Sequence, residues 1–440
     1  MKRIFSLDFI IIFIFGFLFL MNWDQSAIFN FIIFFVLCLA YFWLDQKINY
    51  ASDAITEDKL YRWKKILLFS IIGFVLSVTL VMHIVWRAAD PSLPVHDNVQ
   101  QMEPAVEFLL QGKNPYVENY FQTELAKSAY IITTQGEVFL NPALYHVIKL
   151  PFHILASVPV HLLAKTVFNF YDERLTYLIV FILSLFALFA LPAERRHKFA
   201  LVAFYAFNPL FLSFLVSGRD DVFVLSWLIF TFYFLKKDKI LLSSLMLALA
   251  CTAKHSAWFL VPFYYAYLAT RLRSDGLSAD WRIALSYGGQ VLNLWEKIKQ
   301  ILKNILFLFK KTWLLPAIFL VLMLPFIIWN PLAFYQDTYA YPAGTLVTSY
   351  PINGYGLSVL FYKLGLVKNL TDYLPMWVIQ IPITLLLFYL FIKKQIQDNS
   401  LARMIGGYAI LILVYWLFSR FFHDNYVGFV SQLLLISYFL

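Results

Sequence analysis

The sequence predicts an all-α protein, a polytopic bundle of membrane-spanning helices. Two observations carry this prediction. Of the 440 residues, 61% are hydrophobic and only 14% are charged, and the apolar residues form long continuous runs. A soluble domain could not keep so much apolar surface away from water. Helices satisfy their own backbone hydrogen bonds in lipid, whereas a β-barrel would show short alternating segments.

The apolar runs set the number of helices. A span needs about 20 residues, so we expect about twelve transmembrane helices, within a range of about 10 to 13. The first run resembles a signal peptide, but no small-residue cleavage site follows it, and we expect a retained helix. The runs at 240–253 and 257–270 could together form one kinked span. The runs are 4–22, 27–44, 66–86, 175–192, 199–217, 222–235, 240–253, 257–270, 312–330, 376–393, 401–418 and 426–440.

Basic residues orient these helices. They gather in short connections that the positive-inside rule places in the cytoplasm: 2–3, 47–65, 195–198, 236–239, 271–311 and 393–394. This orientation requires residues 87–174 to stay outside as one long loop. If the apolar stretch 142–165 in that loop crossed the membrane, the basic residues at 195–198 would be placed outside. We therefore expect a pair of interfacial helices there. It carries His146, Lys149, His153 and His161 at near-helical intervals.

The chain divides into two parts. Residues 1–65 are expected to form two transmembrane helices and a cytoplasmic loop, and residues 66–440 form the main module, with a second outer loop at 331–375. The cytoplasmic segment 271–311 contains a basic amphipathic helix suited to the anionic inner leaflet. The net charge of +9 therefore reflects membrane topology rather than nucleic-acid binding.

Asp97 is the first candidate for chemistry. It lies in the polar stretch 95–116, directly after an apolar run, and polar neighbours surround it. Pro104 suits the first turn of a helix that ends at Gly112, so Asp97 would lie just ahead of a helix N-terminus, which favours an ionised carboxylate. An ionised carboxylate can act as a general base. The alternative is a solvated loop residue or a helix cap.

Three later segments place further ionisable groups at membrane surfaces. At 218–221, Arg219 precedes Asp220 and Asp221; this could hold a phosphate or be a plain capping turn. Lys254 and His255 interrupt an apolar stretch, where ionisable groups usually face a cavity, although a lysine can also snorkel to the interface. A short polar turn between the last two runs contains Arg420, His423 and Asn425.

Other signatures are missing. The sequence has no GxxxxGK[ST], GxGxxG, HExxH or CxxC motif, so nucleotide or zinc chemistry of the soluble type has no support. The two cysteines, Cys38 and Cys251, lie in apolar runs without metal-ligand spacing, and we expect no disulfide between them. The loop 331–375 is rich in Tyr, Pro and Gly, which suits sugar faces and the membrane interface equally well.

In this order, the motifs resemble the C-type superfamily of polyprenol-phosphate-dependent glycosyltransferases, and most closely the mannosyltransferase-like branch in glycosyltransferase family 87. The resemblance covers most of residues 66–440; two additional spans precede it, and Asn98 and the Gly-Arg at 218–219 depart from the usual pattern. The matching segments are Asp97, LeuLeuGlnGly at 109–112, AsnProTyr at 114–116, AsnProAlaLeuTyr at 141–145, AsnPro at 208–209, the acids at 220–221, the small-residue helix ending at Lys254, Pro262 and PhePheHisAspAsnTyr at 421–426.

The resemblance implies an inverting glycosyltransferase in the plasma membrane, or in the endoplasmic reticulum with a lumenal site in a eukaryote. Asp97 would deprotonate a glycan or glycolipid acceptor, and the donor would be a hexose such as mannose, or a pentose, on a polyprenyl phosphate. Lys254, Arg219, His255 and Arg420 would bind the phosphate. The sugar or acceptor would contact His96, Glu103, Tyr116, Asp220, Asp221, His423 and Asn425. No metal ligand set is apparent, so a divalent cation is not expected.

Two other functions compete with this one. A flippase or transporter of polyprenyl lipids would also need intramembrane cations, but it would distribute charges along a central pathway on both sides. A membrane scaffold would give no reason for carboxylates to concentrate in the first long outer loop. A glycosyltransferase predicts that the functional charges gather at the outer surface.

Overall fold

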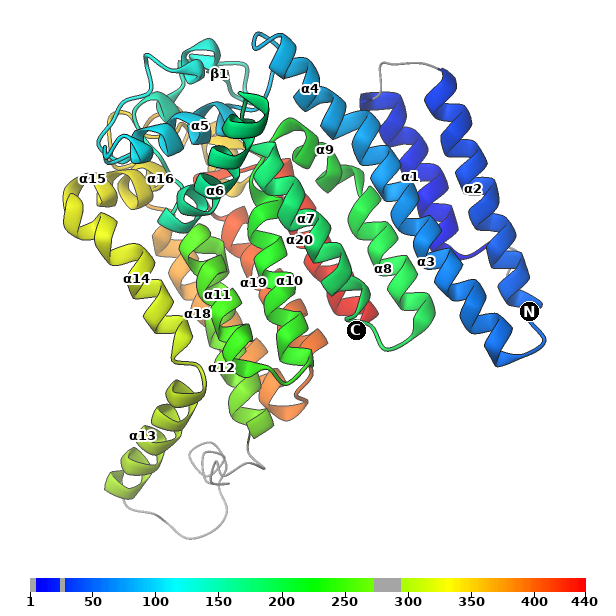
Figure 1. Ribbon diagram of the computed structural model, residues 1–440. Helices are drawn as coiled ribbons and strands as arrows, with labels where there is room; N and C mark the ends of the chain where they lie inside the picture. The colour runs from blue at the N-terminus through cyan, green and yellow to red at the C-terminus, as the bar shows by residue number, and fades with distance from the viewer. Residues whose placement is uncertain (1–4, 24–27, 273–293) are drawn as a thin grey trace.

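The computed structural model describes residues 5–23, 28–272 and 294–440, and most of them are helical, as expected (Figure 1). The first half contains α1 (Leu7–Trp23), α2 (Ile28–Asn49), α3 (Ala54–Leu76), α4 (Met82–Ala89), α5 (Asp97–Leu110), α6 (Pro151–Phe168), α7 (Arg174–Phe189), α8 (Arg195–Phe207) and α9 (Pro209–Ser217). The second half contains α10 (Asp221–Lys236), α11 (Ile240–Ala253), α12 (Leu260–Arg271), α13 (Leu294–Lys311), α14 (Leu314–Trp329), α15 (Pro331–Tyr335), α16 (Tyr341–Ala343), α17 (Leu357–Lys363), α18 (Trp377–Gln397), α19 (Leu401–Leu417) and α20 (Asp424–Phe439).

The N-terminal helices extend the bundle on one side. A five-residue π-helical turn, Ser77–Val81, joins α3 to α4, so residues 54–89 form one continuous helix of 36 residues. The cytoplasmic loop expected at 45–65 is therefore mostly helical. Buried Lys64 on α3 contacts the carboxylates of Asp8 on α1 and Asp45 on α2, and these ion pairs hold the three helices together.

Several helices are long and apolar enough to cross a membrane. Among the described residues, four pass on length and composition, and up to six if each of two bent pairs is one span. One bent pair is α8 and α9, which meet at 47°. The bend follows from the sequence because the Asn208 side chain accepts a hydrogen bond from the Leu210 amide while Pro209 starts the next helix.

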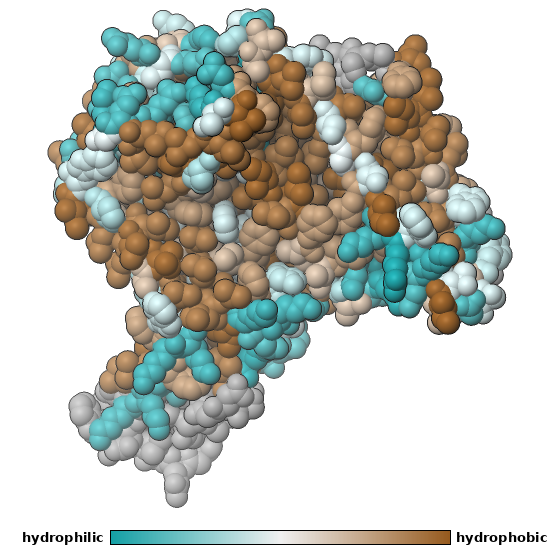
Figure 2. Space-filling view, viewed as in Figure 1, coloured by the Kyte–Doolittle hydropathy of each residue, from teal (hydrophilic) through white to brown (hydrophobic). Residues whose placement is uncertain are grey.

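Polar segments gather at one end of the bundle. Figure 1 shows α5, α15, α16 and the hairpin of β1 (Tyr130–Ile132) and β2 (Val138–Leu140) at this end, which we call the loop end. The turns between α2 and α3, α7 and α8, and α10 and α11 lie at the other end, which we call the basic end. A broad hydrophobic band separates polar regions at the two ends of this face (Figure 2).

Two chain segments pair to close the loop end. Strand β3 (Asn353–Gly354) pairs in parallel with β4 (Phe421–Phe422). This pairing joins the 331–375 segment to the turn between α19 and α20. Gly354 has a φ of +86°, and a Cβ at this position would lie 2.0 Å from the Phe422 carbonyl oxygen. Only glycine accommodates both the left-handed backbone and this close approach.

One expectation about these segments is wrong, and the structure gives more detail on two others. The stretch 142–165 is not a pair of interfacial helices: it contains a single 3₁₀ turn, Pro142–Leu144, followed by α6, which is itself long and apolar enough to cross. The run 240–270 forms two helices, α11 and α12, because Lys254 adopts an extended backbone between them. The amphipathic helix expected within 271–311 corresponds to α13, and the residues of that segment between 273 and 293 lie outside the described part.

Candidate active site

A cavity of about 220 Å³ lies at the loop end of the bundle. Its walls come from six separate parts of the chain: the start of α5, the segment before α6, the α9–α10 turn, the end of α11, the 331–375 segment and the residues around β4. Seven of the residues predicted from the sequence line it together, namely His96, Asp97, Arg219, Asp220, Lys254, His423 and Asn425. This convergence brings together groups that are more than 300 residues apart in sequence.

Backbone contacts bring the start of α5 to the α9–α10 turn. The His96 amide donates to the Ser217 carbonyl at 3.0 Å, and the Asn98 side chain donates to the Gly218 carbonyl at 2.9 Å. Gly218 ends α9 with a φ of +99°, and a Cβ there would lie 2.2 Å from Val99 Cγ2. The glycine of the Gly-Arg-Asp-Asp segment therefore allows these two elements to touch.

Asp97 is the first residue of α5, so the helix begins earlier than Pro104 suggested, and this proline lies inside it. The Asp97 carboxylate accepts a hydrogen bond from Asn141 Nδ2 at 3.1 Å and lies 2.9 Å from His96 Nδ1. Burial alone would raise the pKa of Asp97, but His96 and the Asn141 hydrogen bond outweigh it and hold that pKa well below its usual range. Asp97 is therefore an ionised carboxylate with 29% of its side chain exposed.

Asp220 lies between two lysines on the cavity wall. Its carboxylate oxygens accept hydrogen bonds from Lys149 Nζ at 2.7 Å and Lys254 Nζ at 3.1 Å. Burial opposes the charged form, yet the lysines hold the pKa of Asp220 well below its usual value. Lys254 also donates to Asp221 at 2.7 Å, and its side chain remains 22% exposed to the cavity. Two of its three N–H groups are thus occupied, and one remains for a ligand.

The α9–α10 turn also contacts the start of α20 at the cavity. Arg219 Nη1 donates to Asp424 Oδ1 at 2.8 Å and to Asn425 Oδ1 at 2.9 Å, and its guanidinium packs 4.5 Å from the Phe214 ring centre. The Arg219 side chain is 25% exposed. Burial, with a contribution from Arg219, lowers the pKa of His423 to about 4. The ring is therefore neutral at physiological pH and can accept as well as donate a hydrogen bond.

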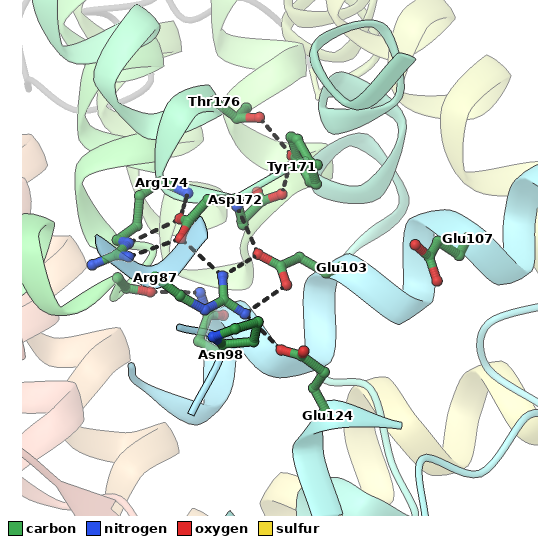
Figure 3. Close-up of polar contacts among 12 residues, drawn as sticks. Arg87, Asn98, Glu103, Glu107, Glu124, Tyr171, Asp172, Arg174 and Thr176 are labelled. Carbon is green, nitrogen blue, oxygen red and sulfur yellow. Dashed lines mark hydrogen bonds and ion pairs between the residues drawn. The ribbon is translucent and has the colours of Figure 1, made fainter. Parts of the chain in front are cut away.

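Glu103 lies on the opposite face of α5 from the cavity, where a buried ion cluster binds both of its oxygens (Figure 3). Arg87 donates to Glu103 at 2.7 and 2.8 Å, to Asp172 at 2.8 Å and to Glu124 at 2.8 Å. Arg174 donates to Asp172 as well. Glu103 therefore does not line the cavity, and its carboxylate fixes α5 against α4 and the start of α7.

Four other predicted residues do not line the cavity. Tyr116 is buried between Phe326 and Phe334, and its hydroxyl donates to the Lys149 carbonyl at 2.7 Å. The Arg420 guanidinium donates to the backbone carbonyls of the 331–375 segment, so it fixes that segment rather than facing a ligand. His255 packs against the Trp258 ring. Asp221 lies just behind the wall and supports Lys254 and Asn425.

The cavity also contains residues that the sequence did not single out as ligands of a substrate. Lys149 and His146 were noted only for their helical spacing, and the structure turns both toward the cavity. His146 lies between Asp337, 2.7 Å from Nδ1, and Thr348, 2.6 Å from Nε2. Tyr341 stacks on His146 at 5.0 Å, and Tyr350 completes the aromatic lining. The Tyr-rich composition of 331–375 was the available signal for these two rings.

The arrangement provides two ionised carboxylates, Asp97 and Asp220, together with a set of cations and aromatic rings around a space open to a small polar group. Within the described residues, no group of three or more His, Cys, Asp and Glu side chains is positioned to hold a metal ion. No family model matches the chain, and comparisons with curated proteins and with solved structures give no match either.

Proposed function

We propose that the chain is an integral-membrane inverting glycosyltransferase that uses a polyprenyl-phosphate sugar as donor. In this proposal about twelve helices cross the membrane, the loop end lies outside, and the acceptor is a glycan or glycolipid on that face. The apolar band and the basic connections at the opposite end support this orientation (Figures 1 and 2). The donor sugar is a hexose such as mannose, or a pentose.

One observation carries the proposal. Asp97, the Lys149–Asp220–Lys254 cluster, Arg219 and His423 meet around one cavity at one end of the bundle. A glycosyl transfer from a lipid phosphate needs a base on one side of the anomeric carbon and cations on the other. The cavity offers a carboxylate and, from other segments, cations with unused N–H donors, so both requirements are present in one place.

The reaction proceeds by a single displacement in this proposal. The acceptor hydroxyl attacks the anomeric carbon while its proton passes to Asp97, and the bond from that carbon to the phosphate oxygen breaks. The electron pair leaves with the lipid phosphate, whose negative charge Lys254, Lys149 and Arg219 stabilise. Asp97 has a low pKa and is a weak base, but the proton becomes acidic as the new bond forms, so an ionised carboxylate suffices.

A lipid flippase is the competing candidate. It would require charged groups along a pathway that reaches both faces. The cavity groups at the loop end, by contrast, lie on one side of the hydrophobic band, which favours an enzyme.

The replacement Asp97→Asn tests the proposal. It keeps the Asn141 contact but removes the base, so transfer by the purified protein from a panel of polyprenyl-phosphate sugars should fall by about a hundredfold or more. Binding of the lipid donor should change little. Glu118→Gln, in the same polar loop but outside the cavity lining, is the matched control and should keep wild-type activity.

The two results together separate enzyme from transporter. Transfer at the wild-type rate by the Asp97→Asn protein would rule out the proposed mechanism. Movement of polyprenyl lipid between leaflets without any sugar transfer would favour the flippase.

A further inference from the structure

A second pocket, of about 310 Å³, lies at the basic end of the bundle, far from the candidate active site. It forms between the first turns of α3 and the α7–α8 turn. Four cations line it, Arg62, Lys65, Arg195 and Lys198, together with one carboxylate, Asp58. Figure 2 shows hydrophilic side chains gathered at this end, directly beyond the hydrophobic band. Because these charges surround a concave pocket, the site suits an anion.

The pocket has more positive charge than its own carboxylate neutralises. Asp58 pairs with Arg195. Within the described residues, Arg62, Lys65 and Lys198 have no carboxylate partner among the ion pairs. Lys65 instead lies 4.6 Å from the centre of the Phe189 ring, and Arg195 lies 5.2 Å from that of Tyr61. The aromatic floor holds the cations in place without neutralising them.

An apolar strip leads from the pocket into the hydrophobic band. Phe189 lines the pocket, and Phe186 and Leu183 follow it on α7 at helical spacing, with 52% and 53% of their surfaces exposed. Ile66 on the neighbouring α3 is 56% exposed. Phe186 stacks on Phe69 at 4.8 Å, which joins the two helices along the strip. The apolar strip starts at the cations of the pocket. A phospholipid has the same arrangement, since its acyl chains are attached to its charged headgroup.

We propose that this pocket binds the phosphate of an anionic phospholipid, with an acyl chain of the same molecule lying along the Phe189–Phe186–Leu183 strip. Basic pockets between helices at a membrane surface are suited to acidic lipid headgroups. The apolar strip distinguishes this ligand from a soluble anion, which would need only the cations. The assignment is independent of the chemistry at the loop end.

Thermal stability of the full-length protein in lipid nanodiscs tests the assignment. Phosphatidylglycerol should raise the Tm of the wild-type protein relative to phosphatidylcholine. The triple variant Arg62→Gln, Lys65→Gln, Lys198→Gln should lose most of this rise, because three cations at about 1 kcal/mol each correspond to about hundredfold weaker lipid binding. The matched control neutralises Lys237, Lys393 and Lys394, which are exposed outside the pocket, and should keep the rise.

Three other outcomes of these measurements would contradict lipid binding at this pocket. An equal rise in the triple variant and the wild type, or equal losses in the triple variant and the control, would overturn the assignment. So would inorganic phosphate that stabilises the wild-type protein as much as the lipid does. If the triple variant does not fold, native mass spectrometry of the wild-type protein decides: phosphatidylglycerol should remain bound after delipidation, and retention no greater than that of phosphatidylcholine would refute the proposal.

Discussion

At the scale of single residues, environment determines what each carboxylate can do. Asp97 and Glu103 are six positions apart on α5, yet they face different surroundings. His96 and Asn141 favour the charged form of Asp97, whereas burial raises the pKa of Glu103 and its partner Arg87 opposes that shift. Asp97 is thus the ionised group that faces the cavity, and Glu103 is part of a buried anchor.

His423 gives the protein a pH dependence that can be measured. In the unfolded chain a histidine takes up a proton near pH 6.5, but in the folded protein His423 does so only near pH 4. As pH falls below about 6.5, the unfolded state gains protons that the folded state does not, so the stability present at higher pH is lost. The Tm of His423→Asn in detergent should therefore fall less between pH 7 and pH 5 than that of the wild-type protein.

The range above pH 7 provides the control for this measurement. His423 is neutral there in both states, so the two Tm curves should run in parallel. A wild-type curve that also runs parallel to the variant between pH 7 and pH 5 would show that His423 is not shielded from protonation.

Individual site residues were predictable where the local sequence was unusual. Lys254 stands out because an ammonium within an apolar stretch needs a partner, and the structure supplies Asp220 and Asp221. The placement of Glu103 was not predictable, because its partner Arg87 comes from a different helix and no spacing rule connects them. The place of Lys149 in the cavity was missed for the same reason: its partner Asp220 is 71 residues away.

At the scale of elements, one part of the cavity wall, which we call the roof, is the segment that carries Tyr341 and Tyr350. Its position depends on a short strand contact rather than on a large sheet. Strands β3 and β4 contribute only two residue pairs, and Arg420 adds hydrogen bonds to three carbonyls beside them. This contact orders the segment that carries Tyr341 and Tyr350. Its strength therefore rests on the backbone approach at Gly354.

Gly354→Ala should disrupt this roof. The added Cβ would lie 2.0 Å from the Phe422 carbonyl oxygen, so the β3–β4 contact must open, and we expect a loss of about 3 kcal/mol or more together with reduced activity. Gly365→Ala is the matched control: Gly365 also has a positive φ, +73°, but its Cβ would meet no atom within 4 Å. That variant should lose only about 1 kcal/mol of backbone strain.

Thermal unfolding of the two variants distinguishes packing from strain. Equal losses would mean that the left-handed backbone alone is responsible and that the β3–β4 approach contributes little.

Helices were more predictable than their boundaries. Apolar runs identified α7, α14, α18, α19 and α20 because lipid-facing helices must be apolar along their length. The polar residues 54–65 gave no such signal, although they continue α3 toward the basic end. The helical start at Asp97 was also missed, since His96 is an uncommon N-cap and Pro104 indicated a later beginning.

At the scale of the whole molecule, the two native cysteines make the proposed orientation directly testable. Cys38 and Cys251 are both buried, so they give little background in labelling experiments. Lys113→Cys at the loop end should react with a membrane-impermeant maleimide on intact cells. Lys237→Cys at the basic end should react only after permeabilisation. The opposite pattern would invert the topology and move the cavity to the inner face.

The continuous helix at 54–89 has a further consequence at this scale. Its 36 residues extend about 54 Å, while the hydrocarbon core of a bilayer is about 30 Å thick. The apolar run 66–86 accounts for about 31 Å of this length and matches the hydrocarbon core, so in the proposed orientation the polar turns at 54–65 project beyond it on the basic side. Lys65 lies where the polar turns meet the apolar run, and the last turn carries Arg87, the anchor of α5. In the proposed orientation this helix is one continuous connection between the two pockets, so a displacement at Lys65 would be carried along its axis to the anchor of α5 and to Asp97.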